Sequence, residues 1–169
     1  MWEYTGQKRP DFAEQPGDGQ ESVWDYPRPP AVREDRRAIE VIANGQVIAS
    51  ATLSHKVCET ASPPTFYLSP DDVNFDLLVP VRGVSVCEWK GAAQYWGLAA
   101  DFENTVGWSY PGPLTGFAEY RNHVSFYPGR VECYIEGERV TPQPGQFYGG
   151  WITSDVVGPF KGYPGTGHW

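Results

Sequence analysis

The chain has 169 residues, of which 40% are apolar and 15% are aromatic, and its formal net charge at pH 7 is −8. This length and apolar content suit one folded domain, whereas the negative charge disfavours electrostatic binding to nucleic acid or to an anionic membrane. No stretch approaches the ~20 apolar residues of a membrane span and the N-terminus has no apolar leader, so we expect a cytoplasmic protein.

The spacing of cysteine and histidine bears on disulfides and metal sites. The three cysteines, Cys58, Cys87 and Cys133, are widely spaced and include no C-x-x-C pair, which disfavours a disulfide framework or a zinc knuckle. None of the three histidines has the H-x-x-x-H or H-E-x-x-H spacing of a metal site. We therefore expect no metal and no cofactor, and the oligomeric state stays open.

The first elements along the chain are an arm and a hairpin. Residues 1–37 are polar and rich in proline and glycine but retain several aromatic rings. We therefore expect an extended arm that packs on a single β domain of residues 38–169. Residues 38–43 alternate between apolar and polar side chains, Asn44-Gly45 favours a type I′ turn, and residues 46–53 return as the second strand.

The middle of the chain contains further short strands. Residues 65–68 have the aromatic and β-branched composition of a strand, and the Ser69-Pro70 pair that follows predicts a capped single helical turn. Residues 84–89 and 94–100 are predicted to pair with each other as two strands across a Lys90-Gly91 turn.

The strand pattern continues toward the C-terminus. Residues 105–110 are predicted to form another strand, and residues 114–120 a short helix. Residues 124–127, 131–136 and 139–140, separated by Pro-Gly and Gly-Glu turns, predict a closing β-meander. Short strands, frequent turns and at most one or two short helices indicate an all-β fold in a single domain.

The last segment, residues 141–169, combines many aromatic rings with many glycines and prolines. Glycine and proline fix an irregular path, and the rings need a rigid surface on which to pack. We therefore expect a C-terminal wrap, defined as residues 141–169, that closes over a sheet and lines a concave face.

Seven tryptophans in a chain of this length exceed the needs of a small core. They predict a pocket walled by rings for a small ligand that is flat or cationic. An alternative is that the rings only attach the arm and the wrap to a sheet, in a structural or protein-interaction domain. The candidate ligand-binding residues are Trp24, Asp25, Arg28, Trp89, Lys90, Trp96, Trp108, Tyr110, Tyr148, Trp151 and Lys161.

Lys90 is the candidate for chemistry, because it lies at a turn between two aromatic segments. A desolvated lysine there could act as a base or a nucleophile, with Tyr95, Tyr110 or His123 as the proton partner. The alternative is a solvated turn lysine that extends over its neighbours. The sequence thus leaves open whether the protein is an enzyme.

Several long blocks of the chain resemble one known family, the domain-of-unknown-function family 427, over about Lys8 to Trp169. The blocks are ESVWDYPRPP at residues 21–30, CEWKGAAQYW at 87–96, WSYP at 108–111, FYGGWIT at 147–153 and VGPFKG at 157–162. The resemblance implies a β-tent fold, similar to that of B-type methionine sulfoxide reductases and of the thalidomide-binding domain of cereblon.

The resemblance also bears on function. Many β-tent proteins hold zinc between two C-x-x-C pairs, which this chain lacks. The cereblon domain binds its ligand in a tryptophan cage, which favours an aromatic pocket here by analogy of fold. The family is catalogued as nucleotidyltransferase-like, but the chain has neither the Gly-Ser turn nor the Asp-x-Asp pair of polymerase-β-like transferases. We therefore disfavour nucleotidyl transfer.

Overall fold

The computed structural model of the protein describes residues 1–83, 85–145 and 147–169. Within these ranges the regular elements are short strands, and helical residues occur only in short 3-10 turns. The prediction of an all-β fold is confirmed. No helix in the described part of the chain is long and apolar enough to cross a membrane.

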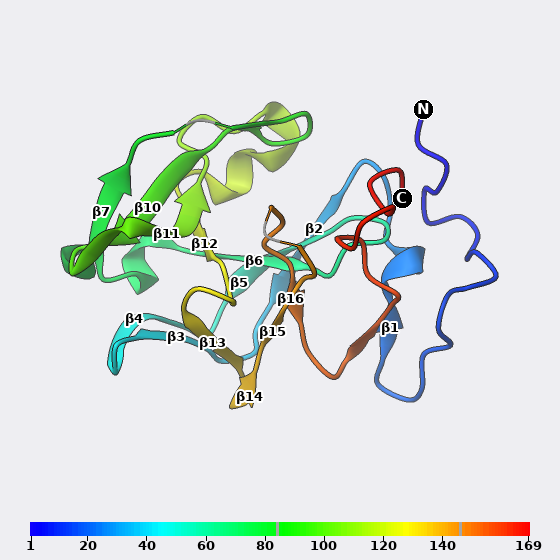
Figure 1. Cartoon of the computed structure of the whole chain (residues 1–169), viewed down its shortest axis with the longest axis horizontal. Helices are drawn as coiled ribbons and strands as arrows, with labels where there is room; N and C mark the ends of the chain where they lie inside the picture. Colours follow the sequence, from blue (N-terminus) through cyan, green and yellow to red (C-terminus); the bar gives the residue numbers. More distant parts are fainter. Residues whose placement is uncertain (84, 146) are drawn as a thin grey trace.

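Two sheets form most of the molecule (Figure 1). The larger sheet contains, in spatial order, β2 (Ala31–Asp35), β5 (Ser54–Cys58), β6 (Thr65–Leu68), β12 (Val124–Phe126), β11 (Asp101–Ser109), β10 (Gln94–Leu98) and β7 (Leu78–Val81). The smaller sheet contains β14 (Glu138–Arg139), β13 (Glu132–Ile135), β3 (Ile39–Ala43) and β4 (Gln46–Ala51).

Three short pairs and four 3-10 turns complete the described elements. The pairs are β1 (Glu21–Ser22) with β17 (Val156–Val157), β15 (Thr141–Pro142) with β16 (Trp151–Ile152), and β8 (Val86–Cys87) with β9 (Gly91–Ala92). The 3-10 turns are Val23–Asp25, Pro70–Asp72, Phe75–Leu77 and Thr115–Tyr120. The β1–β17 pair is parallel, and the other pairs are antiparallel.

The main core lies between the two sheets. Ile39 and Val41 of the smaller sheet pack in one buried cluster with Phe66 and Leu68 of β6. Because side chains alternate along a strand, the intervening Tyr67 points to the opposite face of the larger sheet, where a second aromatic cluster forms. The larger sheet thus has one face on the core and one face available for a site.

The local turn predictions agree with the structure. Asn44 and Gly45 both have positive φ, 52° and 75°, as a type I′ turn between β3 and β4 requires. The Ser69 hydroxyl accepts a hydrogen bond from the backbone N–H of Asp71 at 3.3 Å and so caps the 3-10 turn that begins at Pro70.

Two predictions of strand pairing are wrong, and one predicted short helix is present in 3-10 form. Residues 94–98 pair with β7 and β11, whereas the segment before Lys90 pairs only at β8 with β9. The predicted start of that strand, Val84, lies outside the described residues. The expected closing meander divides between sheets, because β12 pairs with β11 while β13 pairs with β3. The helix predicted at residues 114–120 is a 3-10 segment with a kink at Phe117.

The N-terminal arm packs against the C-terminal wrap (Figure 1). Phe12 stacks on Trp169 with ring centroids 5.1 Å apart, and Trp24 packs edge-on against both rings at the same distance. The C-terminal part of the predicted arm belongs to the larger sheet. Residues 31–35 form β2, which pairs with β5 along its whole length. The β body therefore begins before residue 38.

An ion network joins this part of the larger sheet to the wrap. Arg37 forms salt bridges with Asp35 at 2.8 Å and with Asp155 at 3.1 Å. Burial raises the pKa of Asp35, but hydrogen bonds from Arg37 lower it by more, so this pKa lies below the ordinary value of 3.8. The charged form of Asp35 therefore stabilises the fold.

The variant Asp35→Asn should unfold more easily than the wild-type protein at pH 7. Because the folded-state pKa is depressed, the carboxylate contributes fully above the unfolded-state value, and its contribution is lost as the pH falls through the folded-state value. Urea unfolding of both proteins should show a difference in stability at pH 7 that shrinks below pH 3.8. A difference of equal size at neutral and acidic pH would contradict this role.

Candidate functional site

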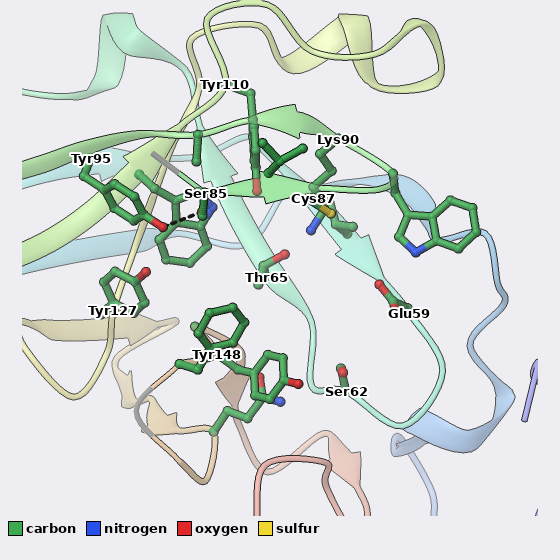
Figure 2. A pocket seen from close by; sticks show the side chains of 18 of the residues that line it. Glu59, Ser62, Thr65, Ser85, Cys87, Lys90, Tyr95, Tyr110, Tyr127 and Tyr148 are labelled. Atoms are coloured by element: carbon green, nitrogen blue, oxygen red, sulfur yellow. Dashed lines mark hydrogen bonds between the residues drawn. The ribbon is translucent and has the colours of Figure 1, made fainter. Parts of the chain in front are cut away.

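A pocket of about 640 Å³ lies on the second face of the larger sheet. It is enclosed by the sheet, by the segment that contains the β8–β9 hairpin and by the wrap (Figure 2). Its described lining includes eight aromatic side chains. These rings are Trp2, Trp89, Tyr95, Trp108, Tyr110, Tyr127, Phe147 and Tyr148.

An irregularity in β11 places Trp108 on the pocket face. Trp96 pairs with Gly107 and Gly97 pairs with Thr105, so Val106 is an extra residue on β11. Such a bulge reverses the alternation of side chains. Thr105 and Trp108 therefore both line the pocket although they are three residues apart, while Val106 is buried in the main core.

Close packing holds the wrap against Trp108. A Cβ atom at Gly149 would overlap the six-membered ring of Trp108, so only glycine allows this approach. The buried Gln143 side chain donates to the carbonyl oxygen of Lys161 at 2.8 Å and accepts from the Gly150 N–H at 3.0 Å. These contacts fix the loop that carries Tyr148, which lies across the pocket from Lys90 and Tyr110 (Figure 2).

Lys90 is half-buried and lines the pocket from the turn between β8 and β9. Its carbonyl oxygen accepts from the Leu114 N–H at 3.0 Å, which fixes the backbone. Burial lowers the pKa of Lys90, but the ionised forms of Tyr67 and Cys87, together with Glu59, raise it by more. The net pKa is above the ordinary lysine value, so the side chain is an ammonium at neutral pH.

Several tyrosine hydroxyls lie in the pocket or in the aromatic cluster beside it. The Tyr67 hydroxyl accepts a hydrogen bond from Trp108 Nε1 at 3.1 Å. Burial, followed by the charge of Tyr67, raises the pKa of Tyr110 and of Tyr120, and burial raises the pKa of Tyr127 to about 12. The hydroxyls of Tyr110, Tyr120 and Tyr127 are therefore neutral at physiological pH and can donate hydrogen bonds.

Lys161 and Trp2 form one side of the pocket mouth. Lys161 is 5% exposed, and its ammonium lies 4.7 Å from the ring centroid of Trp2 and 5.5 Å from that of Tyr148. It also donates to the main-chain oxygen of Trp169 at 3.2 Å. Burial, and then the charge of Arg28, lower the pKa of Lys161.

The structure brings together seven of the predicted site residues and adds others. The seven that line the pocket are Trp89, Lys90, Tyr95, Trp108, Tyr110, Tyr148 and Lys161. The pocket is also lined by residues that the sequence did not indicate, namely Trp2, Tyr127, Glu59, Arg82 and Arg130. Strand alternation from Tyr67 could have indicated Thr65, another lining residue, but nothing local in the sequence indicates Trp2.

Two predicted pocket tryptophans are core residues instead. Trp24 is fully buried beneath the arm, and its Nε1 donates to the Pro159 carbonyl oxygen at 3.1 Å. Trp151 is fully buried between the sheets, and its Nε1 donates to the Phe126 carbonyl oxygen at 2.9 Å. Their polar atoms are satisfied by the backbone, so their role is packing.

Trp96 and His123 also lie outside the pocket. Trp96 packs against the main core, and its Nε1 donates to the Ser109 hydroxyl at 3.0 Å. His123 packs edge-on against His55, with ring centroids 5.1 Å apart, and burial lowers its pKa. His123 therefore does not serve Lys90 as a proton partner, whereas Tyr95 and Tyr110 share the pocket with it.

The two charged residues predicted near the N-terminus have structural contacts. Asp25 is exposed and pairs with Arg9 at 2.7 Å. Arg28 lies beside the pocket mouth without lining it; its side chain is 2% exposed and pairs with Glu59 at 3.2 Å. It also stacks on Trp2, with its guanidinium carbon 3.9 Å from the ring centroid. Arg28 thus positions two pocket residues, Glu59 and Trp2.

Within the described residues, no group of three or more histidine, cysteine, aspartate or glutamate side chains is placed to hold a metal ion. The three cysteines are free thiols; Cys58 and Cys133 are buried, and Cys87 is half-buried at the pocket. The chemistry that the pocket offers is therefore ring stacking, phenol and indole hydrogen bonds, and the charge of its lysines.

Comparison with known proteins gives one match. A family model described as Domain of unknown function (DUF427), with the short name NTP_transf_9, matches residues 31–137. That range begins at β2 and ends just after β13, so it covers the larger sheet, the smaller sheet except β14, and more than half of the chain. No curated protein matches the chain.

Proposed function

The chain belongs to the family described as Domain of unknown function (DUF427), and we propose that it binds a small planar molecule in the pocket on the second face of its larger sheet. The observation that carries this proposal is the enclosure of one cavity of about 640 Å³ by rings from separate parts of the chain. Apolar cavities of this size with a few polar groups are typical of small-molecule sites.

The arrangement of the rings supports a planar ligand. Trp108 is held rigidly by Gly149 and by its hydrogen bond to Tyr67. Tyr148 faces the sheet from the opposite side of the pocket (Figure 2). A flat molecule between these two walls would stack on aromatic surfaces, which contributes about 0.5 to 1.5 kcal/mol for each ring pair beyond area burial.

Polar groups within the pocket would orient such a ligand. Trp89 Nε1 is buried and has no hydrogen-bond partner among the described residues. A buried donor without a partner costs free energy, so a ligand with an acceptor atom would be favoured at Trp89. The concave shape also favours a small ligand over a protein partner, which would need an exposed apolar patch.

Catalysis by Lys90 has less support. A lysine base or nucleophile needs a neutral amine near pH 7, which requires a lowered pKa. The pKa of Lys90 is instead raised. The ammonium form suits the binding of a ligand more than the abstraction of a proton.

A thermal-shift screen of the purified protein tests the proposal. The panel should contain planar rings such as uracil, nicotinamide and cyclic imides, with saturated analogues of similar size and nucleoside triphosphates with magnesium. A planar ligand at about 100 times its dissociation constant should add roughly 2.7 kcal/mol of stability. Absence of any response to planar compounds, or a response only to magnesium nucleotides, would contradict the proposal.

The variant Tyr148→Ala should weaken binding of the best planar compound by about tenfold, because one stacking wall is lost. Tyr148 is 36% exposed, so its removal should cost little stability. The matched control is Tyr163→Ala, because Tyr163 is an exposed ring of the same wrap that does not line the pocket. Titration by intrinsic tryptophan fluorescence measures both variants. If Tyr148→Ala and Tyr163→Ala bind the compound with equal affinity, the ligand does not stack on Tyr148.

A further inference from the structure

We propose that the ligand is a planar carboxylic acid whose carboxylate binds Lys90 while its ring stacks between Trp108 and Tyr148. This inference rests on the proposed function, which it deepens by naming the chemical class of the ligand. It arises from the charges in the pocket and from the surroundings of Lys90.

The pocket differs in charge from the rest of the protein. The chain carries a formal net charge of −8. The described lining residues include four cationic side chains, Lys90, Lys161, Arg82 and Arg130, against two carboxylates, Glu59 and Glu88. An acidic protein with a cationic pocket concentrates small anions there by its local potential. The same positive potential would repel a cationic ligand.

Glu59 is the carboxylate of the pocket that acts on the pKa of Lys90, and it already has a partner. Arg28 pairs with Glu59 at 3.2 Å, and Arg28 is itself buried beside the pocket mouth. Among the described residues, Lys90 forms no salt bridge. An ammonium that faces the pocket without a salt-bridge partner can form a charge-assisted hydrogen bond with an anionic group of a ligand.

The groups around Lys90 suit a carboxylate. Cys87 and Tyr110 lie on the same side of the pocket as the Lys90 side chain, and Thr65 lies between this side and Tyr148 (Figure 2). The hydroxyls of Tyr110 and Thr65, which line the pocket, can donate hydrogen bonds to a ligand oxygen. One ammonium and these two hydroxyls match the single negative charge of a carboxylate.

Tyr67 interacts with both Trp108 and Lys90, since its hydroxyl accepts from the indole N–H and it raises the pKa of Lys90. A simple probe is therefore an acid whose carboxylate is attached directly to its ring.

Matched acid and amide pairs test this inference. The probes are nicotinate with nicotinamide, and indole-3-carboxylate with indole-3-carboxamide, titrated calorimetrically at pH 7.5 against the full chain. In the wild-type protein each acid should bind about tenfold more tightly than its amide, because a charge-assisted hydrogen bond replaces a neutral one. Uridine monophosphate serves as the phosphate-bearing planar probe and should bind more weakly than the acids.

Variants then assign the effect to Lys90. Lys90→Met should remove the preference for the acid and leave the affinity for the amide unchanged. Lys90→Arg keeps the charge and should retain the preference. Arg36→Met is the control, because Arg36 is an exposed cation that does not line the pocket, and this variant should keep the preference. Circular dichroism and melting temperature confirm that each variant is folded.

The outcomes separate this inference from the proposed function. Amides that bind as tightly as acids, a preference that survives Lys90→Met, or tighter binding of the nucleotide would each overturn the assignment of a carboxylic acid. In those cases planar compounds still bind and the proposed function stands. If no member of either pair binds, while the wider planar panel also fails, both proposals are wrong.

Discussion

Replacing Trp151 with alanine should lower the free energy of unfolding by about 3 to 5 kcal/mol, the usual cost of removing a large aromatic side chain from a core. Trp151 is fully buried, and the centroid of its ring lies 5.1 Å from the centroid of the Phe66 ring. The substitution also leaves the Phe126 carbonyl oxygen without the indole donor that now reaches it at 2.9 Å. Urea unfolding followed by circular dichroism measures the effect.

The variant Trp151→Ala also distinguishes a role of Trp151 in the core from a role in the pocket. Because Trp151 does not line the pocket, the folded fraction of Trp151→Ala should bind a planar ligand with wild-type affinity. Trp151→Phe is the matched control and should lose less stability, since it retains most of the ring volume. A stability loss below about 1 kcal/mol, or a binding defect in folded protein, would show that the core assignment is wrong.

Replacing Arg28 with methionine should have an effect of similar size, about 3 to 5 kcal/mol, because it leaves a partly buried carboxylate without its partner. Besides Glu59, Arg28 donates to main-chain oxygens of three separate segments. These oxygens belong to Tyr4 at 2.9 Å, Thr60 at 3.1 Å and Trp169 at 2.8 Å. One side chain thus connects the arm, the sheet and the wrap.

The matched control is Arg33→Met. Arg33 pairs with Glu21 at 3.3 Å, but its side chain is 49% exposed, and exposed ion pairs contribute only about 0 to 1 kcal/mol. Arg28→Met should also expose the arm to limited proteolysis, whereas Arg33→Met should not. Equal stability loss and equal cleavage in both variants would contradict the connecting role of Arg28.

Local chemistry made some elements predictable from the sequence. The Asn44-Gly45 turn and the Ser69 cap depend on residue types that favour one backbone geometry, and the structure contains both. Strand residues such as 65–68 followed from composition alone. The all-β class follows from many such local signals together.

Pairing between strands could not be predicted in the same way. The Lys90-Gly91 turn indicates a hairpin but not its length, and among the residues that the structure describes only Val86–Cys87 forms strand pairs across it with Gly91–Ala92. Residues 94–98 pair instead with β7 and β11. Those partners are chosen by burial of apolar faces over long sequence distances, and a turn motif carries no information about them.

The candidate site was predictable in residue type and only partly in position. Trp108 and Trp151 are alike in composition, yet one lines the pocket and the other lies in the core. A single extra residue at Val106 sets the face of Trp108, and sequence periodicity does not reveal where a bulge occurs. Trp2 joins the pocket because Arg28 and Lys161 hold its ring, an arrangement that only tertiary structure creates.

The parallel β1–β17 pair has a consequence for how the protein is made. Glu21 pairs with Val156, and Trp24 Nε1 reaches Pro159, which is 135 residues later in the chain. A ribosome that adds about 5 to 20 residues per second would synthesise that interval in roughly 7 to 27 seconds. Throughout this time Trp24 and Tyr26 lack the C-terminal residues that pack against them in the folded protein, so these two side chains are buried late.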